Sequence, residues 1–78
     1  MLIKQPSDWT NLAQVIQYAE TLTRETHIQQ TVYCINGRNH YAVCVAGQLP
    51  PDFIKIGKLI VRKDHQQRYS PVYTTREA

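Results

Sequence analysis

An Asn-Gly pair at positions 36 and 37 interrupts a stretch rich in β-branched and aromatic residues, which extends from residue 28 to residue 45. Asn-Gly between apolar runs is the strongest short signal for a β-hairpin, because these two residues tolerate the positive φ angles of tight hairpin turns. The sequence therefore predicts two antiparallel strands within residues 28–45. The loop between them holds either two residues, 36–37, or four, 36–39.

Both loop lengths assign the side chains of the hairpin to the same two faces, because side chains alternate along a strand. One face carries Ile28, Val32, Cys34, Tyr41, Val43 and Val45. The other carries Thr31, Tyr33, Ile35, His40, Ala42 and Cys44, joined by Arg38 if the loop has two residues. We expect the helix of the chain to cover the first face.

This register argues against a metal site or a disulfide at the two cysteines. Cys34 and Cys44 are expected on opposite faces, and His40 is expected roughly 13 Å from Cys44 along one face. Zinc ligands all lie ~2 Å from one ion, and the Cβ atoms of bonded cysteines lie ~4 Å apart. We therefore expect no metal, no cofactor and no disulfide, but two small apolar thiols. Reduced thiols in a chain without a secretory signal indicate a cytoplasmic protein.

Residues 7–25 are predicted to form an amphipathic helix. Pro6 prevents the helix from extending backward, and Ser7 or Asp8 can cap its first N–H groups. Its apolar stripe, in which Trp9 is expected to be largely buried, consists of Trp9, Leu12, Ala13, Val15, Ile16, Ala19 and Leu22. The opposite face is polar and uncharged, which fits a contact surface or an ordinary solvated face; it consists of Asn11, Gln14, Gln17, Tyr18 and Thr21.

A third strand is predicted over residues 58–63. Phe53, Ile56 and Ile60 have helical spacing, but Gly57 and the β-branched residues around it disfavour a helix. Residues 46–52, which include two successive prolines, are expected to be a loop.

The last segment of the chain, residues 65–78, has no periodicity. Val72 and Tyr73 are expected to add a brief fourth strand or an edge contact. Residues 1–6 and 74–78 are expected to be frayed, as chain ends often are.

Together these elements predict a single α+β domain over residues 1–78. One N-terminal amphipathic helix packs on a small antiparallel sheet of three or four strands, arranged as a meander in the order α-β-β-β. Apolar residues make up 42% of the chain, which is enough for one core between a helix and a sheet. No apolar run approaches the ~18 residues of a membrane span, so we expect no membrane partner.

All of the net charge of +3 comes from the last third of the chain. Cations interspersed with aromatic rings suit a phosphate backbone and exposed bases. The candidate polyanion-binding residues are Lys55, Lys58, Arg62, Lys63, Arg68 and Tyr69. Basic residues that alternate with apolar ones also protect an edge strand from aggregation, which is a purely structural explanation.

The far side of the predicted hairpin is a second candidate surface. If the helix covers one face, Tyr33, Ile35 and His40 lie open on the other unless the tail around residues 71–73 folds over them. An exposed patch of this kind marks a protein interface. The candidate protein-binding residues are Tyr18, Tyr33, Ile35 and His40.

The sequence offers no acid–base pair of carboxylates, no activated nucleophile and no Gly-rich phosphate loop. We therefore expect no catalytic residues, no enzymatic activity and no small-molecule substrate. Only 19% of the residues are charged, which leaves surface for a protein partner or a homodimer. The leading hypothesis is a non-catalytic adaptor, regulator or inhibitor, of the accessory type common in phages and mobile elements, that binds a larger macromolecule. The alternative is a nucleic-acid-binding protein that uses the basic C-terminal third.

Overall fold

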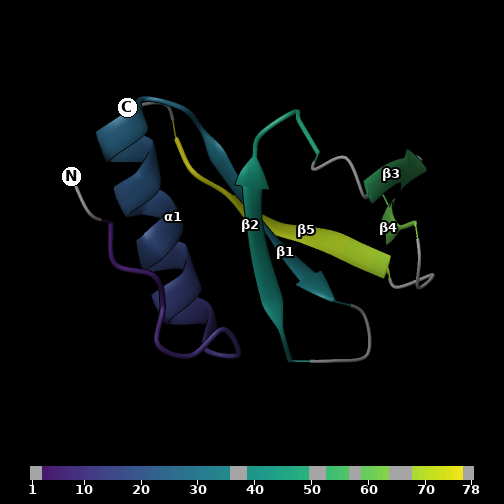
Figure 1. Cartoon of the computed structure of the whole chain (residues 1–78), viewed down its shortest axis with the longest axis horizontal. Coiled ribbons are helices and arrows are strands. Elements are labelled where there is room, and N and C mark those ends of the chain that lie inside the picture. Colours follow the sequence, from purple (N-terminus) through teal and green to yellow (C-terminus); the bar gives the residue numbers. More distant parts are fainter. Residues whose placement is uncertain (1–2, 36–38, 50–52, 57–58, 64–67, 77–78) are drawn as a thin grey trace.

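The computed structural model describes residues 3–35, 39–49, 53–56, 59–63 and 68–76. Its elements are α1 (Leu12–Thr26), β1 (Gln30–Ile35), β2 (Tyr41–Val45), β3 (Phe53–Ile56), β4 (Leu59–Arg62) and β5 (Arg68–Thr74). The strands form one antiparallel sheet in the order β2-β1-β5-β4-β3, with the helix packed at one end (Figure 1). The predicted α+β class with an N-terminal helix is confirmed, although the sheet has five strands and not three or four.

The helix begins five residues later than predicted because a different residue caps it. The Asn11 side chain accepts a hydrogen bond from the Gln14 backbone N–H at 3.3 Å. The Asp8 carboxylate instead accepts hydrogen bonds from the Thr10 backbone N–H and hydroxyl, at 2.9 and 2.5 Å. These bonds lower the pKa of Asp8 and fix a turn before the helix. The helix ends at His27, whose left-handed conformation lets its N–H reach the Thr23 carbonyl at 2.8 Å.

The hairpin of β1 and β2 has the four-residue loop. The Ile35 N–H donates to the His40 carbonyl at 3.0 Å, and Val32 pairs with Val43 across the strands. Residues 36–38 of the loop lie outside the described residues. This register confirms the predicted division of the hairpin into two faces, with Cys34 and Cys44 on opposite sides.

The remaining strands do not form the predicted meander. β5 lies between β1 and β4, so the strand that follows β2 in the chain lies at the far edge of the sheet. The stretch predicted as one strand over 58–63 forms the second half of an antiparallel pair, β3 with β4. The brief strand predicted at Val72 and Tyr73 is a seven-residue strand, β5, with an irregularity where Val32 and Tyr33 meet it.

One core lies between the helix and the sheet. Val15, Ala19 and Val32 are fully buried there. Partly buried side chains surround them: Trp9, Leu12, Ile16, Tyr41, Val43 and Tyr73. The helix therefore covers the predicted face. Trp9 precedes the helix and is only half-buried, so its predicted near-complete burial is wrong; its ring packs edge-to-face on Tyr18 at 5.7 Å.

A second core fills the other side of the same hairpin. Its four buried residues come from β1, β4 and β5: Tyr33, Ile35, Ile60 and Tyr69. Around them pack Ala42 and Cys44 of β2, together with Leu49 and Phe53. Because residues from both ends of the strand order meet in this core, the sheet curls around it.

The end of the described chain is well ordered by contacts with the rest of the fold. Thr75 is 2% exposed, and its N–H donates to the Gln30 carbonyl at 2.9 Å. Of residues 74–78, which were expected to be frayed, Thr74 ends β5 and Thr75 is held by this bond, and positions 77–78 lie outside the described residues. Of residues 1–6, which were expected to fray as well, Ile3 and Pro6 are half-buried.

Candidate protein-binding surface

The largest exposed apolar side chains that share a strand are Ile54 and Ile56 of β3, which are 45% and 61% exposed. Phe53 of the same strand packs into the second core. Since side chains alternate along a strand, Ile54 and Ile56 point to the opposite side, away from that core. Their partners on β4 are Val61 and Leu59, both half-buried. We call these four residues, Ile54, Ile56, Leu59 and Val61, the open face of the β3–β4 hairpin.

The helix does not cover the open face. Its buried residues, Val15 and Ala19, pack on Val32 of β1. The helix and the β3–β4 hairpin lie at opposite ends of the long dimension of the molecule, which measures 34 Å (Figure 1). The helix therefore screens the β1–β2 end of the sheet and leaves Ile54 and Ile56 of β3 exposed.

β3 is also an edge strand. It pairs with β4 on one side, and none of the described residues pairs with it on the other. The opposite edge of the sheet differs, because the Tyr41 N–H of β2 donates to the Trp9 carbonyl at 3.0 Å. An unpaired edge presents backbone N–H and C=O groups that can bond to another strand.

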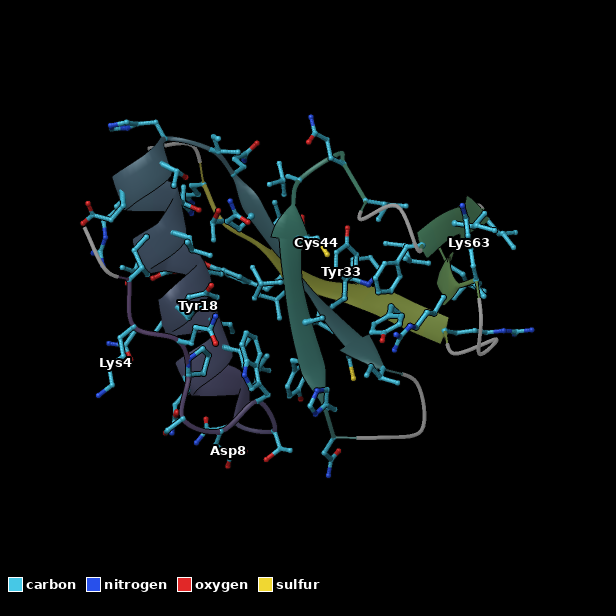
Figure 2. The ribbon with its side chains drawn as sticks, viewed as in Figure 1. Lys4, Asp8, Tyr18, Tyr33, Cys44 and Lys63 are labelled. Carbon is cyan, nitrogen blue, oxygen red and sulfur yellow. The ribbon has the colours of Figure 1, made fainter. Side chains whose placement is uncertain are left out.

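Cations border the open face. Arg68 of β5 is exposed and pairs with Val61, which places it on the same side of the sheet. Lys63 is exposed just beyond the end of β4, far from the helix (Figure 2). The stretch from 53 to 76 contains six Lys and Arg residues against one acid, Asp64, which lies outside the described residues.

Two of the four predicted protein-binding residues are not on the surface. Tyr33 and Ile35 are only 7% and 8% exposed, so of the two alternatives for this face, open or covered, the face is covered. The sheet curls and brings Ile60 and Tyr69 over them, in place of the predicted tail. Tyr33 lies beside Cys44 on the side of β2 turned from the helix (Figure 2). Burial raises the pKa of the Tyr33 phenol, and the Cys44 thiol adds to the effect.

The other two predicted protein-binding residues lie apart from each other. His40 is exposed beside the loop that precedes β2. Tyr18 is half-buried on the outer side of the helix and lines a pocket of about 320 Å³ under the N-terminal segment. Other residues around this pocket are Lys4, Gln5, Pro6, Ser7, Gln14, Gln17 and Thr21. The structure therefore does not assemble the four residues into one surface.

Only some of the predicted polyanion-binding residues lie at the surface. Lys63 and Arg68 are exposed, and Arg62 is half-buried. Tyr69 is 6% exposed and packs edge-to-face on Phe53 at 4.9 Å, so its expected role as an exposed stacking ring is wrong. Lys58 and the side chain of Lys55 lie outside the described residues.

Among the described residues, no three His, Cys, Asp or Glu side chains gather in a group that could hold a metal ion. No helix in the described part of the chain has the length and apolar character needed to cross a membrane. Comparison with protein-family models, curated proteins and solved structures gives no significant match for this chain.

The sequence prediction missed Ile54 and Ile56 because it placed a strand only after Gly57, over residues 58–63. A usable signal was present: Gly57-Lys58 separates two four-residue runs rich in β-branched residues. Two such runs separated by Gly and one further residue are typical of a tight hairpin. That pattern predicts both strands, and alternation then places Ile54 and Ile56 on one side.

Proposed function

We propose that the protein is a non-catalytic binding protein, an adaptor, regulator or inhibitor, that docks on a partner protein through the open face of the β3–β4 hairpin. The observation that carries this proposal is the exposure of Ile54 and Ile56 on a strand that the helix leaves uncovered. Covering the exposed part of each side chain would contribute about 1 kcal/mol to binding. Apolar surface rimmed by charge is typical of interaction sites.

A protein partner explains the open face better than a nucleic acid does. Nucleic-acid surfaces combine cations with exposed rings that stack on bases. Lys63 and Arg68 supply the cations, but the ring closest to them in the sheet, Tyr69, is inside the second core. Exposed isoleucines have no counterpart on a phosphate backbone, whereas they match the apolar centre of a protein interface.

The proposal includes an accessory role in the cytoplasm, which two cysteines on opposite faces of one hairpin support. It assigns no catalytic step to any residue.

The test is an affinity capture from the native host, with and without nuclease, using three forms of the protein. The first is the wild type and the second is the double variant Ile54→Asp/Ile56→Asp. The third, Ile28→Asp, is a matched control, because Ile28 is an exposed isoleucine at the other end of the molecule with 48% exposure. We expect a nuclease-resistant protein partner that the wild type and Ile28→Asp capture and the double variant loses. A partner that disappears with nuclease, or that all three forms capture equally, would contradict the proposal.

A further inference from the structure

We infer that β3 binds its partner by strand addition, and that the added strand is an extended segment in which acidic residues alternate with apolar ones. This inference rests on the proposed function and names the chemistry of the partner.

The geometry of β3 favours an extended backbone as the ligand. In an antiparallel pair, alternate residues direct their N–H and C=O groups away from the partner strand. Two of the four residues of β3 therefore direct these groups outward, at an edge where none of the described residues pairs with the strand. An extended peptide can bond to these groups, and its side chains then alternate between the two sides of the sheet.

The open face selects apolar side chains on one side of the added strand. Side chains on that side of the ligand lie next to Ile54 and Ile56, because neighbouring strands keep directly opposite residues about 5 Å apart on one face. An apolar side chain opposite Ile54 extends the apolar pair of Ile54 and Val61 across the sheet. One opposite Ile56 does the same for the pair of Ile56 and Leu59.

The charge around the hairpin favours a ligand of net negative charge, which the positions facing away from Ile54 and Ile56 can carry. Arg68 lies on the open-face side, two strands from β3, so it acts on these carboxylates through the long-range field and not by direct ion pairs. Lys63 and Arg68 are exposed, and in the described part of residues 53–76 every charged residue is Lys or Arg. A ligand with carboxylates gains from this field, and its association also becomes faster. A basic ligand is repelled by it.

A second copy of the chain is a poorer occupant of the same edge. A second copy paired through β3 would carry the same cations on its own β4 and β5, so it would supply no carboxylates to complement Lys63 and Arg68. The other edge of the sheet is a poorer site for a ligand strand, because the Tyr41 N–H already bonds to the Trp9 carbonyl.

The test is a titration of ¹⁵N-labelled full-length protein, followed by amide NMR shifts, with three synthetic heptapeptides. The acidic peptide alternates Val with Glu, and the basic peptide alternates Val with Lys. The third is the acidic peptide with alternate backbone nitrogens methylated, which removes donors without changing the side-chain charge. We expect the acidic peptide to shift the amides of residues 53–56. We expect the basic and the methylated peptides to bind at least about tenfold more weakly.

Protein variants check that the site is the one inferred. Ile54→Asp/Ile56→Asp should weaken the acidic peptide by at least about tenfold, and Ile28→Asp should leave its affinity unchanged. Because these isoleucines are exposed, the variants should keep the wild-type pattern of amide signals outside β3 and β4. Sedimentation of the wild type should give a monomer.

Five results would overturn the inference: no binding of the acidic peptide, equal binding of the basic peptide, equal binding of the methylated peptide, tighter binding of a single-stranded oligothymidylate at the same amides, or a dimer that Ile54→Asp/Ile56→Asp dissociates. Its failure is distinguishable from that of the proposed function. If the host partner is captured through Ile54 and Ile56 and the acidic peptide does not bind, only strand addition is lost. If capture does not depend on Ile54 and Ile56, the proposed function is lost.

Discussion

The hydroxyl oxygen of Thr75 lies 2.5 Å from that of Thr23, and this buried hydrogen bond joins the helix to a residue 52 positions later in the chain. The Thr75 hydroxyl oxygen also accepts the Gln30 N–H at 3.0 Å. One side chain thus connects the helix, the first strand and the segment after β5, next to the core in which Val15 and Val32 lie.

Replacing this hydroxyl should destabilise the protein although the shape of the side chain is kept. Thr75→Val leaves the buried Gln30 N–H without its acceptor, so we expect a loss of roughly 1–3 kcal/mol in the free energy of unfolding. Urea denaturation measures it. Thr21→Val is the matched control, because the Thr21 hydroxyl donates to the Gln17 carbonyl at an exposed site, and should change the stability by less than about 0.5 kcal/mol. Equal effects of the two substitutions would show that the Thr75 network does not stabilise the fold.

Tyr69 should behave as a core residue and not as a ligand-binding ring. Tyr69→Ala removes a ring that packs on Phe53 at 4.9 Å, and it should lower the free energy of unfolding by about 3–5 kcal/mol. Val72→Ala, at a 47% exposed position on the same strand, should have a much smaller effect. Urea denaturation again measures both. A Tyr69→Ala protein of nearly wild-type stability would contradict the burial of this ring.

The phenol of Tyr73 should titrate at unusually high pH. It donates a hydrogen bond to the Glu20 carboxylate at 2.6 Å, and this bond raises the pKa of Tyr73 above its ordinary value of 10.0. The folded state thus favours the protonated phenol, so the stability that the bond supplies is complete below pH ~10 and is lost as the pH rises through the folded pKa.

Phenolate absorbance measures this shift, and the difference between wild type and Tyr73→Phe isolates Tyr73 from the other tyrosines. Glu20→Gln should bring the pKa of Tyr73 down toward 10.0. Glu25→Gln, which removes an exposed carboxylate from the same helix, should leave the pKa of Tyr73 raised. An unchanged Tyr73 titration in Glu20→Gln would exclude the hydrogen bond as the cause.

The two cysteines should fail to form an intramolecular disulfide in the folded protein. Cys34 and Cys44 project from opposite faces of the β1–β2 pair, so their sulfur atoms cannot approach to bonding distance without unfolding the hairpin. After mild oxidation and alkylation under denaturing conditions, mass spectrometry of the monomer should find both thiols alkylated. A linked Cys34–Cys44 peptide would contradict the observed register.

The β1–β2 hairpin and the face that the helix covers could be predicted from the sequence, because both depend on local alternation. Asn36-Gly37 marked the turn, and parity placed Val32 and Val43 under the helix whichever loop length was used. The start of the helix was harder, since Ser7, Asp8 and Asn11 are all good capping residues and only the bond from the Gln14 N–H identifies the cap.

The position of β5 between β1 and β4 could not be predicted, because it depends on long-range pairing that no local pattern encodes. This insertion curls the sheet, which buries Tyr33 and Tyr69 and moves the exposed surface to Ile54 and Ile56. The burial of these two rings was therefore missed for one reason. The sequence shows that Tyr33 and Tyr69 have side chains suited to binding, but it does not show which strands cover them.

The most direct test of strand addition at β3 is the hydrogen exchange of its backbone amides in full-length protein, with and without the Val-Glu heptapeptide. Outward-facing amides of an unpaired edge exchange quickly, and pairing with an added strand protects them. We predict that the peptide slows exchange within residues 53–56 and leaves the amides of β2 unchanged. Unchanged exchange at residues 53–56, with protection appearing at β2 or around the pocket beside Tyr18, would contradict it.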